Sequence, residues 1–219
     1  MNHKLAIIIP YRNRKEHLDQ FVPYMKEFLT NSNIDFSIVV VEQANENKFN
    51  RGKLINIGFD LEKNNCTYIS PHDVDLLPES SDYSVPEVPT HLATYRSQSN
   101  YVLEYETYFG GVNLFLNDHF TKINGFSNLY PGYAAEDDDL FLRCVKKGLN
   151  PKRREGRYTC LYHTYEHVTN DMIENNRSMY RKTYNDINSM DNDGLTTLDY
   201  EVINKSDDDF IHYKVNFTL

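Results

Sequence analysis

Residues 4–9 read KLAIII, a short apolar run with three consecutive isoleucines that is followed at once by Pro10. A run of this length and composition predicts a buried β-strand, which we expect Pro10 to end. The same kind of run returns as DFSIVVV at residues 35–41 and, in shorter form, as TYIS at residues 67–70. The first third of the chain is therefore expected to supply three buried strands.

Two amphipathic segments separate these strands. Residues 15–29 place apolar side chains on one helical face, and residues 50–61 carry Leu54, Ile57 and Leu61 at helical spacing. The alternation of strand and helix predicts an α/β fold, with a central, mostly parallel sheet and right-handed crossovers. Ligands of such sheets bind beyond the carboxyl ends of the strands, so the loops after the three strands are expected to share one edge.

The second half of the chain has a less regular pattern. We expect short strands at 112–116 and 158–162, a short helix at 118–123 capped by Asp118, and a helix at 137–147 ended by Gly148. Residues 164–192 are polar and rich in Asn, which predicts a mobile segment with a helix in its middle. The tail, 198–217, alternates like a β-hairpin with its turn at 205–209.

The composition excludes several classes of protein. The chain has 219 residues, which suits one domain, and 40% hydrophobic and 25% charged residues, as in ordinary globular proteins. Its net charge of −9 argues against a nucleic-acid partner, because phosphate backbones need clustered Lys and Arg. The same acidity is compatible with a divalent cation. The sequence does not indicate the oligomeric state.

Cysteine usage and hydropathy bear on the compartment. The three cysteines, at 66, 144 and 160, are widely spaced and odd in number, which favours a reducing compartment over a disulfide framework. No apolar run approaches the roughly 20 residues that a transmembrane helix needs. We therefore expect a cytoplasmic protein, or one held only peripherally at a membrane.

Two acidic motifs carry the first candidate chemistry. Asp73 and Asp75 lie two apart just after a predicted strand, where they can present oxygen ligands to Mg²⁺ or Mn²⁺; the alternative is an acidic turn. Glu136-Asp137-Asp138-Asp139 opens a predicted helix. Such a run either complements the helix dipole or crowds one carboxylate until its raised pKa makes it a general base.

Cationic and sulfur-containing side chains supply the remaining candidates. Arg12, Arg14 and Arg51 have the guanidinium geometry that suits a diphosphate, although ordinary surface arginines would look the same. Cys160 and His163 could converge on one metal from a strand end. Together, a metal, a diphosphate and a separate base would describe metal-assisted transfer from a nucleotide-sugar.

The order of these motifs resembles the β-1,4-galactosyltransferase family, whose members have the GT-A fold, a Rossmann-like nucleotide-diphospho-sugar transferase fold. The resemblance covers roughly residues 5–203 and rests on motifs that occur in the family's order. The matching stretches are Pro10-Tyr11-Arg12-Asn13-Arg14, Phe49-Asn50-Arg51, Asp73-Val74-Asp75, Tyr108-Phe109-Gly110-Gly111, Ile123-Asn124-Gly125-Phe126, Glu136-Asp137-Asp138-Asp139, Cys160 with His163, and Asp193-Gly194-Leu195.

The resemblance implies a single glycosyltransferase domain over residues 1–219 and a role for each site residue. The implied divisions are a nucleotide-sugar-binding half at 1–80, an acceptor and catalytic half at 100–163, a mobile loop region at 164–192 and a tail at 193–219. Asp137 would be the catalytic base, and Glu136 and Asp138 would orient donor and acceptor. The residues implied at the donor site are Pro10, Arg12, Arg14, Phe49, Arg51, Asp73, Val74, Tyr108, Gly111 and Tyr133. Those implied to hold Mn²⁺, or Mg²⁺ or another divalent ion, are Asp75, His163 and Cys160.

The implied activity is inverting transfer of galactose from a UDP-sugar to a hydroxyl of a glycan or glycoconjugate, in a β-linkage that the family makes as β-1,4. Tyr108 looks like the form that prefers galactose, because a bulky ring leaves little room for an acetamido group. The sequence departs from the family where Cys160 replaces a usual Met and where Tyr133-Ala134-Ala135 replaces Trp-Gly-Gly. The first change bears on metal preference, and the second leaves the acceptor sugar open.

Three alternatives remain at this stage. The same scaffold could transfer N-acetylgalactosamine or glucose. A catalytically silent protein would bind UDP or a glycan without turnover. A metal-dependent phosphohydrolase would cleave UDP-sugars without needing an acceptor.

Overall fold

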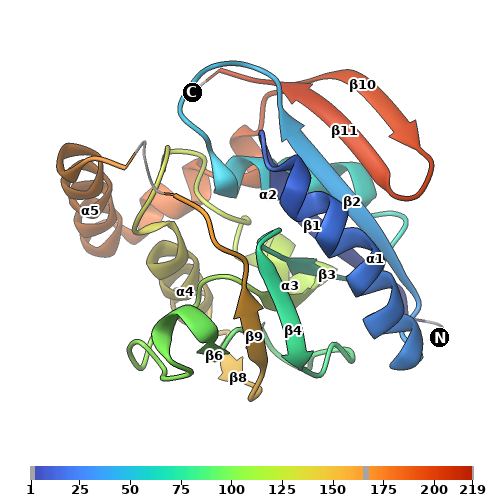
Figure 1. The fold of residues 1–219 in the computed structure, drawn as a ribbon. Helices are drawn as coiled ribbons and strands as arrows, with labels where there is room; N and C mark the ends of the chain where they lie inside the picture. Colours follow the sequence, from blue (N-terminus) through green and yellow to red (C-terminus); the bar gives the residue numbers. More distant parts are fainter. Residues whose placement is uncertain (1–2, 165–167, 219) are drawn as a thin grey trace.

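The computed structural model describes residues 3–164 and 168–218 and contains two sheets (Figure 1). The large sheet has eight strands in the order β10-β11-β2-β1-β3-β7-β5-β8, and the small one has the order β4-β9-β6. The strands are β1 (Leu5–Tyr11), β2 (Phe36–Gln43), β3 (Tyr68–Pro71), β4 (Leu76–Ser80), β5 (Thr90–His91), β6 (Tyr95–Arg96), β7 (Asn113–Leu116), β8 (Lys152–Arg153), β9 (Arg157–Cys160), β10 (Glu201–Asp207) and β11 (Ile211–Asn216).

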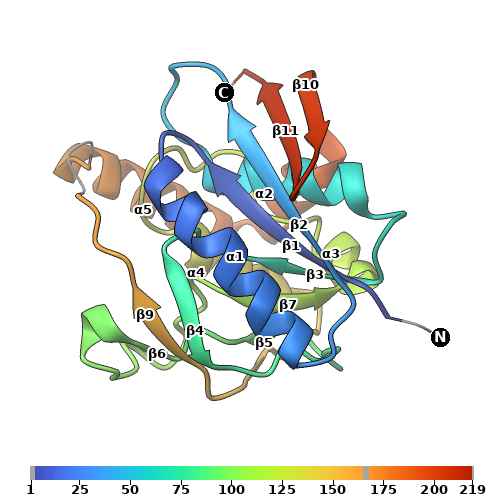
Figure 2. The same cartoon turned by 45° about the vertical axis from the view of Figure 1, so that its right-hand side comes forward.

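Helices cover both faces of the large sheet. They are α1 (Lys15–Asn31), α2 (Arg51–Glu62), α3 (Asn117–Lys122), α4 (Glu136–Lys146) and α5 (Asn170–Asn185), with 3₁₀ turns η1 (Ser97–Ser99), η2 (Ile187–Asn192) and η3 (Leu195–Thr197). Figure 2 shows α1 crossing one face of the sheet while α2 lies on the other. Among the described residues, no helix is both long enough and apolar enough to span a lipid bilayer.

Alternation along β1 explains this two-sided packing. Leu5, Ile7 and Ile9 belong to the core cluster that includes α1. Ala6 and Ile8 belong to the cluster that includes α2. Because successive side chains of a strand point to opposite faces, an unbroken apolar run is what a strand buried on both faces requires.

The parallel centre of the sheet confirms the predicted α/β class. β1 pairs in parallel with both β2 and β3, as right-handed strand–helix–strand crossovers require. The predicted tail hairpin is also present, and its β11 joins the large sheet in parallel beside β2. The Asn45 side chain donates to the Phe217 carbonyl at 2.8 Å, and Lys53 donates to the Thr218 carbonyl at 2.7 Å. The tail thus braces the loop between β2 and α2.

Two local expectations are corrected. Pro10 does not end β1, which continues to Tyr11. β3 pairs with β1 only as far as Ile8, so at Pro10 one neighbouring strand remains and the missing N–H disturbs little of the ladder. Asp118 does not cap α3 either: the helix begins at Asn117 with Leu116 at the cap position, and Asp118 lies in the first turn, where its charge suits the helix dipole.

Gly58 marks the close approach of α2 to the sheet. A Cβ atom there would lie 2.5 Å from the Ile8 Cγ2 atom and 3.0 Å from the Val41 Cγ2 atom. We expect Gly58→Ala to lower the free energy of unfolding by about 1–3 kcal/mol through overpacking. Urea denaturation measures this, with Thr30→Ala at an exposed position of α1 as the control. Equal stability of wild type and Gly58→Ala would show that α2 can shift at no cost.

Candidate active site

The Asp73-Val74-Asp75 turn lies between β3 and β4 and divides its two carboxylates between two partners. Asp73 Oδ1 accepts a hydrogen bond from Arg51 Nε at 2.7 Å, and Asp75 Oδ2 lies 2.8 Å from His163 Nδ1. Val74 between them is 8% exposed and packs in the apolar core. Any contact between Val74 and the donor would therefore come from its main chain.

Arg51 joins three separate segments of the chain. Besides Asp73, its guanidinium donates to Asp137 Oδ1 at 2.9 Å and to the Gly111 carbonyl at 3.4 Å. Burial opposes the charged form of Arg51, but the two carboxylates outweigh it and hold the pKa of the guanidinium above its usual value. In this structure Arg51 holds Asp73 and Asp137 in one site. The contact of Arg51 with a diphosphate, expected from the sequence, stays a prediction.

Asp137 has the environment of a general base. It lies in the first turn of α4, which follows Ala134 and Ala135, both in the left-handed region with φ of 84° and 74°. Burial raises the pKa of Asp137 well above the usual value; Arg51 opposes this rise, and Glu136 and Asp73 add to it. A carboxylate whose pKa is raised can accept a proton near neutral pH.

The four consecutive carboxylates do not act alike. Asp138 Oδ1 accepts a hydrogen bond from the Tyr105 hydroxyl at 2.9 Å. Burial raises the pKa of Glu136, which the charge of Arg51 opposes. Asp139 is fully buried and pairs with Arg143 Nε at 2.6 Å. Glu136, Asp137 and Asp138 therefore belong to the site, whereas Asp139 anchors the helix.

Gly110 brings the Tyr108 hydroxyl close to this base. A Cβ atom on Gly110 would lie 2.6 Å from both Asp137 Oδ2 and Tyr108 Oη. No side chain fits there, because both oxygens already face the glycine. Gly111 adopts a φ of 81°, a conformation that glycine favours, and its carbonyl accepts from the Asp73 backbone amide at 3.2 Å.

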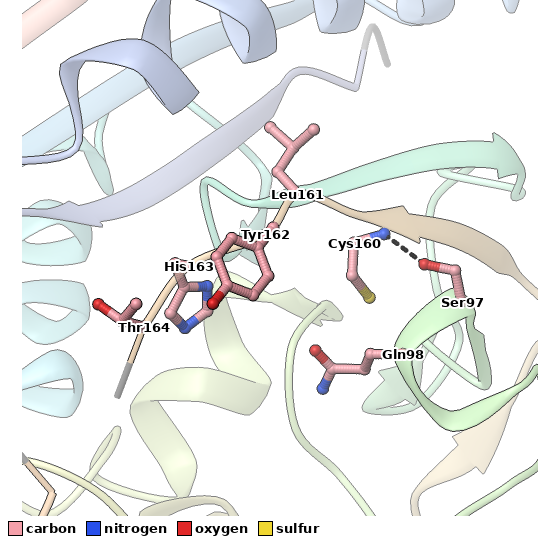
Figure 3. Close-up of a pocket in the computed structure, with 7 residues that line it drawn as sticks. All are labelled: Ser97, Gln98, Cys160, Leu161, Tyr162, His163 and Thr164. Atoms are coloured by element: carbon pink, nitrogen blue, oxygen red, sulfur yellow. Dashed lines mark hydrogen bonds between the residues drawn. The ribbon is translucent and has the colours of Figure 1, made fainter. Parts of the chain in front are cut away.

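A hollow of about 540 Å³ opens beside the Asp75–His163 contact (Figure 3). Its lining consists of Ser97, Gln98, Cys160, Leu161, Tyr162, His163 and Thr164. Figure 3 shows the Cys160 sulfur and the His163 imidazole on one side of their shared segment, with Leu161 on the other. The Leu161 amide donates to the Asp75 carbonyl at 2.8 Å, which ties this segment to the Asp73–Asp75 turn.

These donors fit a divalent cation in part. A carboxylate and an imidazole that already touch can both bind Mn²⁺, and open positions would remain for phosphate oxygens. Within residues 3–164 and 168–218, however, no three His, Cys, Asp or Glu side chains form a group that could hold a metal ion. Asp75 and His163 therefore suit the predicted metal, whereas Cys160 as a third ligand stays a prediction.

The predicted arginines of the first loop lie on two sides of the site. The Arg12 guanidinium stacks over the Phe49 ring at 5.5 Å and donates to the Asn47 carbonyl at 2.6 Å. Arg14 lies near Asp75; burial raises the pKa of that carboxyl, but His163 and Arg14 together bring it below the usual value. Pro10 is buried within β1. Tyr133 is 48% exposed, beside the start of α4.

Several residues of the site were missed by sequence reasoning. Tyr105 contacts Asp138, and the buried Arg96 stacks on the Tyr108 ring at 4.7 Å. Both come from the irregular stretch around η1, where no periodic pattern marks which side chains turn inward. The sequence therefore held no signal for them.

The fold and this arrangement of carboxylates and arginine define a glycosyltransferase of the GT-A class. Residues 1–85 match the family model described as the N-terminal region of glycosyl transferase group 7, and residues 90–168 match the N-terminal domain of galactosyltransferase. The chain belongs to the β-1,4-galactosyltransferase family.

Individual relatives agree with this assignment. Mouse β-1,4-galactosyltransferase 4 is 40% identical over 168 residues, covering 74% of this chain and 49% of that protein. Human β-1,4-galactosyltransferase 1 is 36% identical over 208 residues, covering 92% and 51%. This chain thus spans about half the length of the curated relatives it matches.

Solved structures support the fold over nearly the whole chain. The catalytic domain of Drosophila β-1,4-galactosyltransferase 7, in complex with xylobiose, has a TM-score of 0.84 and 31% identity, covering 98% of this chain and 93% of that one. Mannosyl-3-phosphoglycerate synthase from Rubrobacter xylanophilus has a TM-score of 0.53 at 10% identity, which shows a shared fold alone.

Proposed function

We propose that this protein transfers galactose from UDP-galactose to a hydroxyl group of a sugar acceptor, with inversion, in a β-1,4 linkage. The observation that carries the proposal is the Arg51 bridge, which holds the candidate base Asp137 beside Asp73 of the acidic turn. This bridge would keep the proposed base next to the proposed donor site. A mutant of the Drosophila enzyme, with a TM-score of 0.80 and 29% identity, was solved with manganese, UDP-Gal and xylobiose, which supports this donor.

The proposed reaction is a single in-line displacement. Asp137 accepts the proton of the acceptor hydroxyl as that oxygen attacks the anomeric carbon, and the bond from this carbon to the diphosphate oxygen breaks. Mn²⁺, bound by Asp75 and His163, would neutralise the charge of the departing UDP. Asp138, held by Tyr105, would orient the acceptor. Because one displacement suffices, no covalent intermediate is needed.

The acceptor would bind between the start of α4 and its neighbouring aromatic rings. Tyr105 and Tyr133 are 43% and 48% exposed, and amphipathic rings suit a sugar face. Asn176 of α5 donates to the Pro131 and Tyr133 carbonyls at 3.1 and 2.9 Å and so holds this wall. The methyl groups of Ala134 and Ala135 would narrow the acceptor site relative to glycines. Residues 165–167 of the predicted loop region lie outside the described residues.

The direct test measures UDP release with Mn²⁺ from UDP-galactose, UDP-glucose, UDP-N-acetylgalactosamine and UDP-N-acetylglucosamine. Each donor is supplied with and without a panel of sugar acceptors. We expect acceptor-stimulated release with UDP-galactose. Tight UDP binding without turnover would favour a silent binding protein, and rapid release that no acceptor stimulates would favour a phosphohydrolase.

Metal dependence gives a separate prediction. Chelation with EDTA is expected to abolish transfer, and added Mn²⁺ to restore it. We expect Asp75→Asn to weaken Mn²⁺ binding by at least the roughly 10- to 100-fold that loss of an outer-shell partner costs, because it removes a charged ligand. Electron paramagnetic resonance of free Mn²⁺ measures this, with Asp82→Asn, at an exposed ion pair, as the control. Unchanged Mn²⁺ binding in Asp75→Asn would remove this carboxylate from the metal site.

A further inference from the structure

The Tyr108 ring is enclosed on three sides. The Arg96 guanidinium covers one face at 4.7 Å from the ring centroid. The His91 and Tyr105 rings meet Tyr108 edge-on, at centroid distances of 5.3 and 5.4 Å and interplanar angles of 84° and 80°. These two rings and the guanidinium together restrict movement of the Tyr108 ring, and the guanidinium lies over one of its faces.

Arg96 is itself held in place. It ends β6, is 8% exposed, and forms an ion pair with Glu104. A guanidinium stacked on an aromatic face contributes more when water is excluded from it. The Glu104 contact holds the guanidinium in place over the ring, so Arg96 acts as a cap on it.

The position of Tyr108 makes this cap functionally relevant. Its hydroxyl faces Gly110 beside Asp137 Oδ2, so the ring stands next to the reacting groups. Movement of the ring away from this place would open space next to the candidate base. The side chain that immobilises Tyr108 therefore controls how much space is left beside the candidate base.

We propose that Arg96 is a positioning residue that fixes the Tyr108 ring and thereby excludes donor sugars with a bulky substituent beside Asp137. The inference rests on the proposed function, because it assumes a UDP-sugar donor. A direct phosphate contact is the competing role for a buried arginine. It is disfavoured here, since the guanidinium is stacked on Tyr108, paired with Glu104 and has a side chain only 10% exposed.

The test compares Arg96→Gln, Arg96→Lys and Arg157→Gln. Arg157 is a matched control, because its guanidinium stacks on Tyr101 at 3.9 Å and pairs with Glu79 in a more exposed place. For each protein we measure kcat and KM with UDP-galactose and UDP-N-acetylgalactosamine, and the dissociation constant of UDP. Nuclear magnetic resonance line shapes of a carbon-13-labelled Tyr108 ring report its flip rate without any turnover.

In Arg96→Gln we expect the preference in kcat/KM for UDP-galactose to fall by about 3- to 30-fold, the range that a cation–π contact spans from exposed to desolvated sites. The change should lie mainly in a lower KM for UDP-N-acetylgalactosamine. The Tyr108 flip rate should rise by a similar factor while UDP affinity stays unchanged. Arg96→Lys, which keeps the cation but loses the planar guanidinium, should restore only part of the preference, and Arg157→Gln should behave like wild type.

Two results would overturn the proposal. One is an unchanged flip rate and donor preference in Arg96→Gln. The other is a large loss of UDP affinity with donor preference intact, which would indicate the phosphate contact instead. If the wild type transfers neither sugar, the proposed function fails, whereas the flip rate still decides whether Arg96 immobilises the ring.

Discussion

Asp137→Asn is expected to lower kcat for galactose transfer by about 10²- to 10⁴-fold, the usual contribution of a positioned general base. The amide has the shape of the carboxylate but cannot accept the acceptor's proton. Affinity for UDP should be kept, because the Asp73 side of the Arg51 bridge remains. Steady-state kinetics with the best acceptor, together with calorimetry of UDP binding, separates these two effects.

The control for this variant is Asp118→Asn, which removes an acidic side chain from the first turn of another helix, α3. It should leave kcat within about twofold of wild type, because it alters only helix electrostatics. Should Asp137→Asn retain a large share of wild-type kcat, another group must take the proton and the assignment is wrong.

The pH dependence of kcat/KM of the wild-type protein should report the ionisation of the same base. The pKa of Asp137 is raised chiefly by burial and further by Glu136 and Asp73. The protonated form, present at low pH, cannot act as a base, so kcat/KM should rise with pH. The midpoint of this rise should lie well above the usual Asp pKa of about 3.9. Because these carboxylates titrate together, the midpoint of the pH profile describes the coupled carboxylates and not Asp137 alone.

Arg51→Met is expected to lower the free energy of unfolding by about 3–5 kcal/mol at neutral pH, as when one partner of a buried ion pair is removed. The substitution leaves Asp73 and Asp137, which are about three-quarters buried, without their shared cation. Urea denaturation measures the loss. Arg177→Met, which breaks an exposed pair with Glu174 on α5, should cost less than about 1 kcal/mol.

The stability loss in Arg51→Met should depend on pH with a definite sign. Asp73 and Asp137 already have raised pKa values in the folded protein, owing first to burial, and loss of the guanidinium raises them further. A carboxyl whose pKa is higher folded than unfolded destabilises the fold above the unfolded value, so the loss should shrink as pH falls towards about 4. A loss that does not vary with pH would mean that packing around Arg51 matters more than its charge.

The periodic part of the fold could be predicted from the sequence, and the loops around the site could not. β1, α1, β2 and α2 follow from apolar runs and helical spacing, because burial on a sheet imposes those patterns. The short strands β5, β6 and β8 have two residues each. Their pairing depends on segments far away in the chain, which leaves no local pattern to detect.

The candidate site also has a part that could be predicted from the sequence and a part that could not. Asp73, Asp75 and Asp137 stood out because carboxylates beside a strand end or a helix start are chemically conspicuous. The sequence could not show that Arg51 pairs with two of these carboxylates, since its partners are 22 and 86 residues away. Nor could it separate Asp139 from the other three acids, because the distinction comes from its burial against Arg143 and Tyr130.

The bracing of the β2–α2 loop by the tail also constrains the order of events during synthesis. Asn45 and its Phe217 partner are 172 residues apart, and β11 pairs with β2 over a comparable distance. Contacts so distant in the chain form slowly, because a long loop must close first. On the ribosome, the loop that carries Phe49 must wait for nearly all of residues 1–218 to emerge before its last supports form. Until then, β2 presents an unpaired edge that chaperones or neighbouring nascent chains can reach.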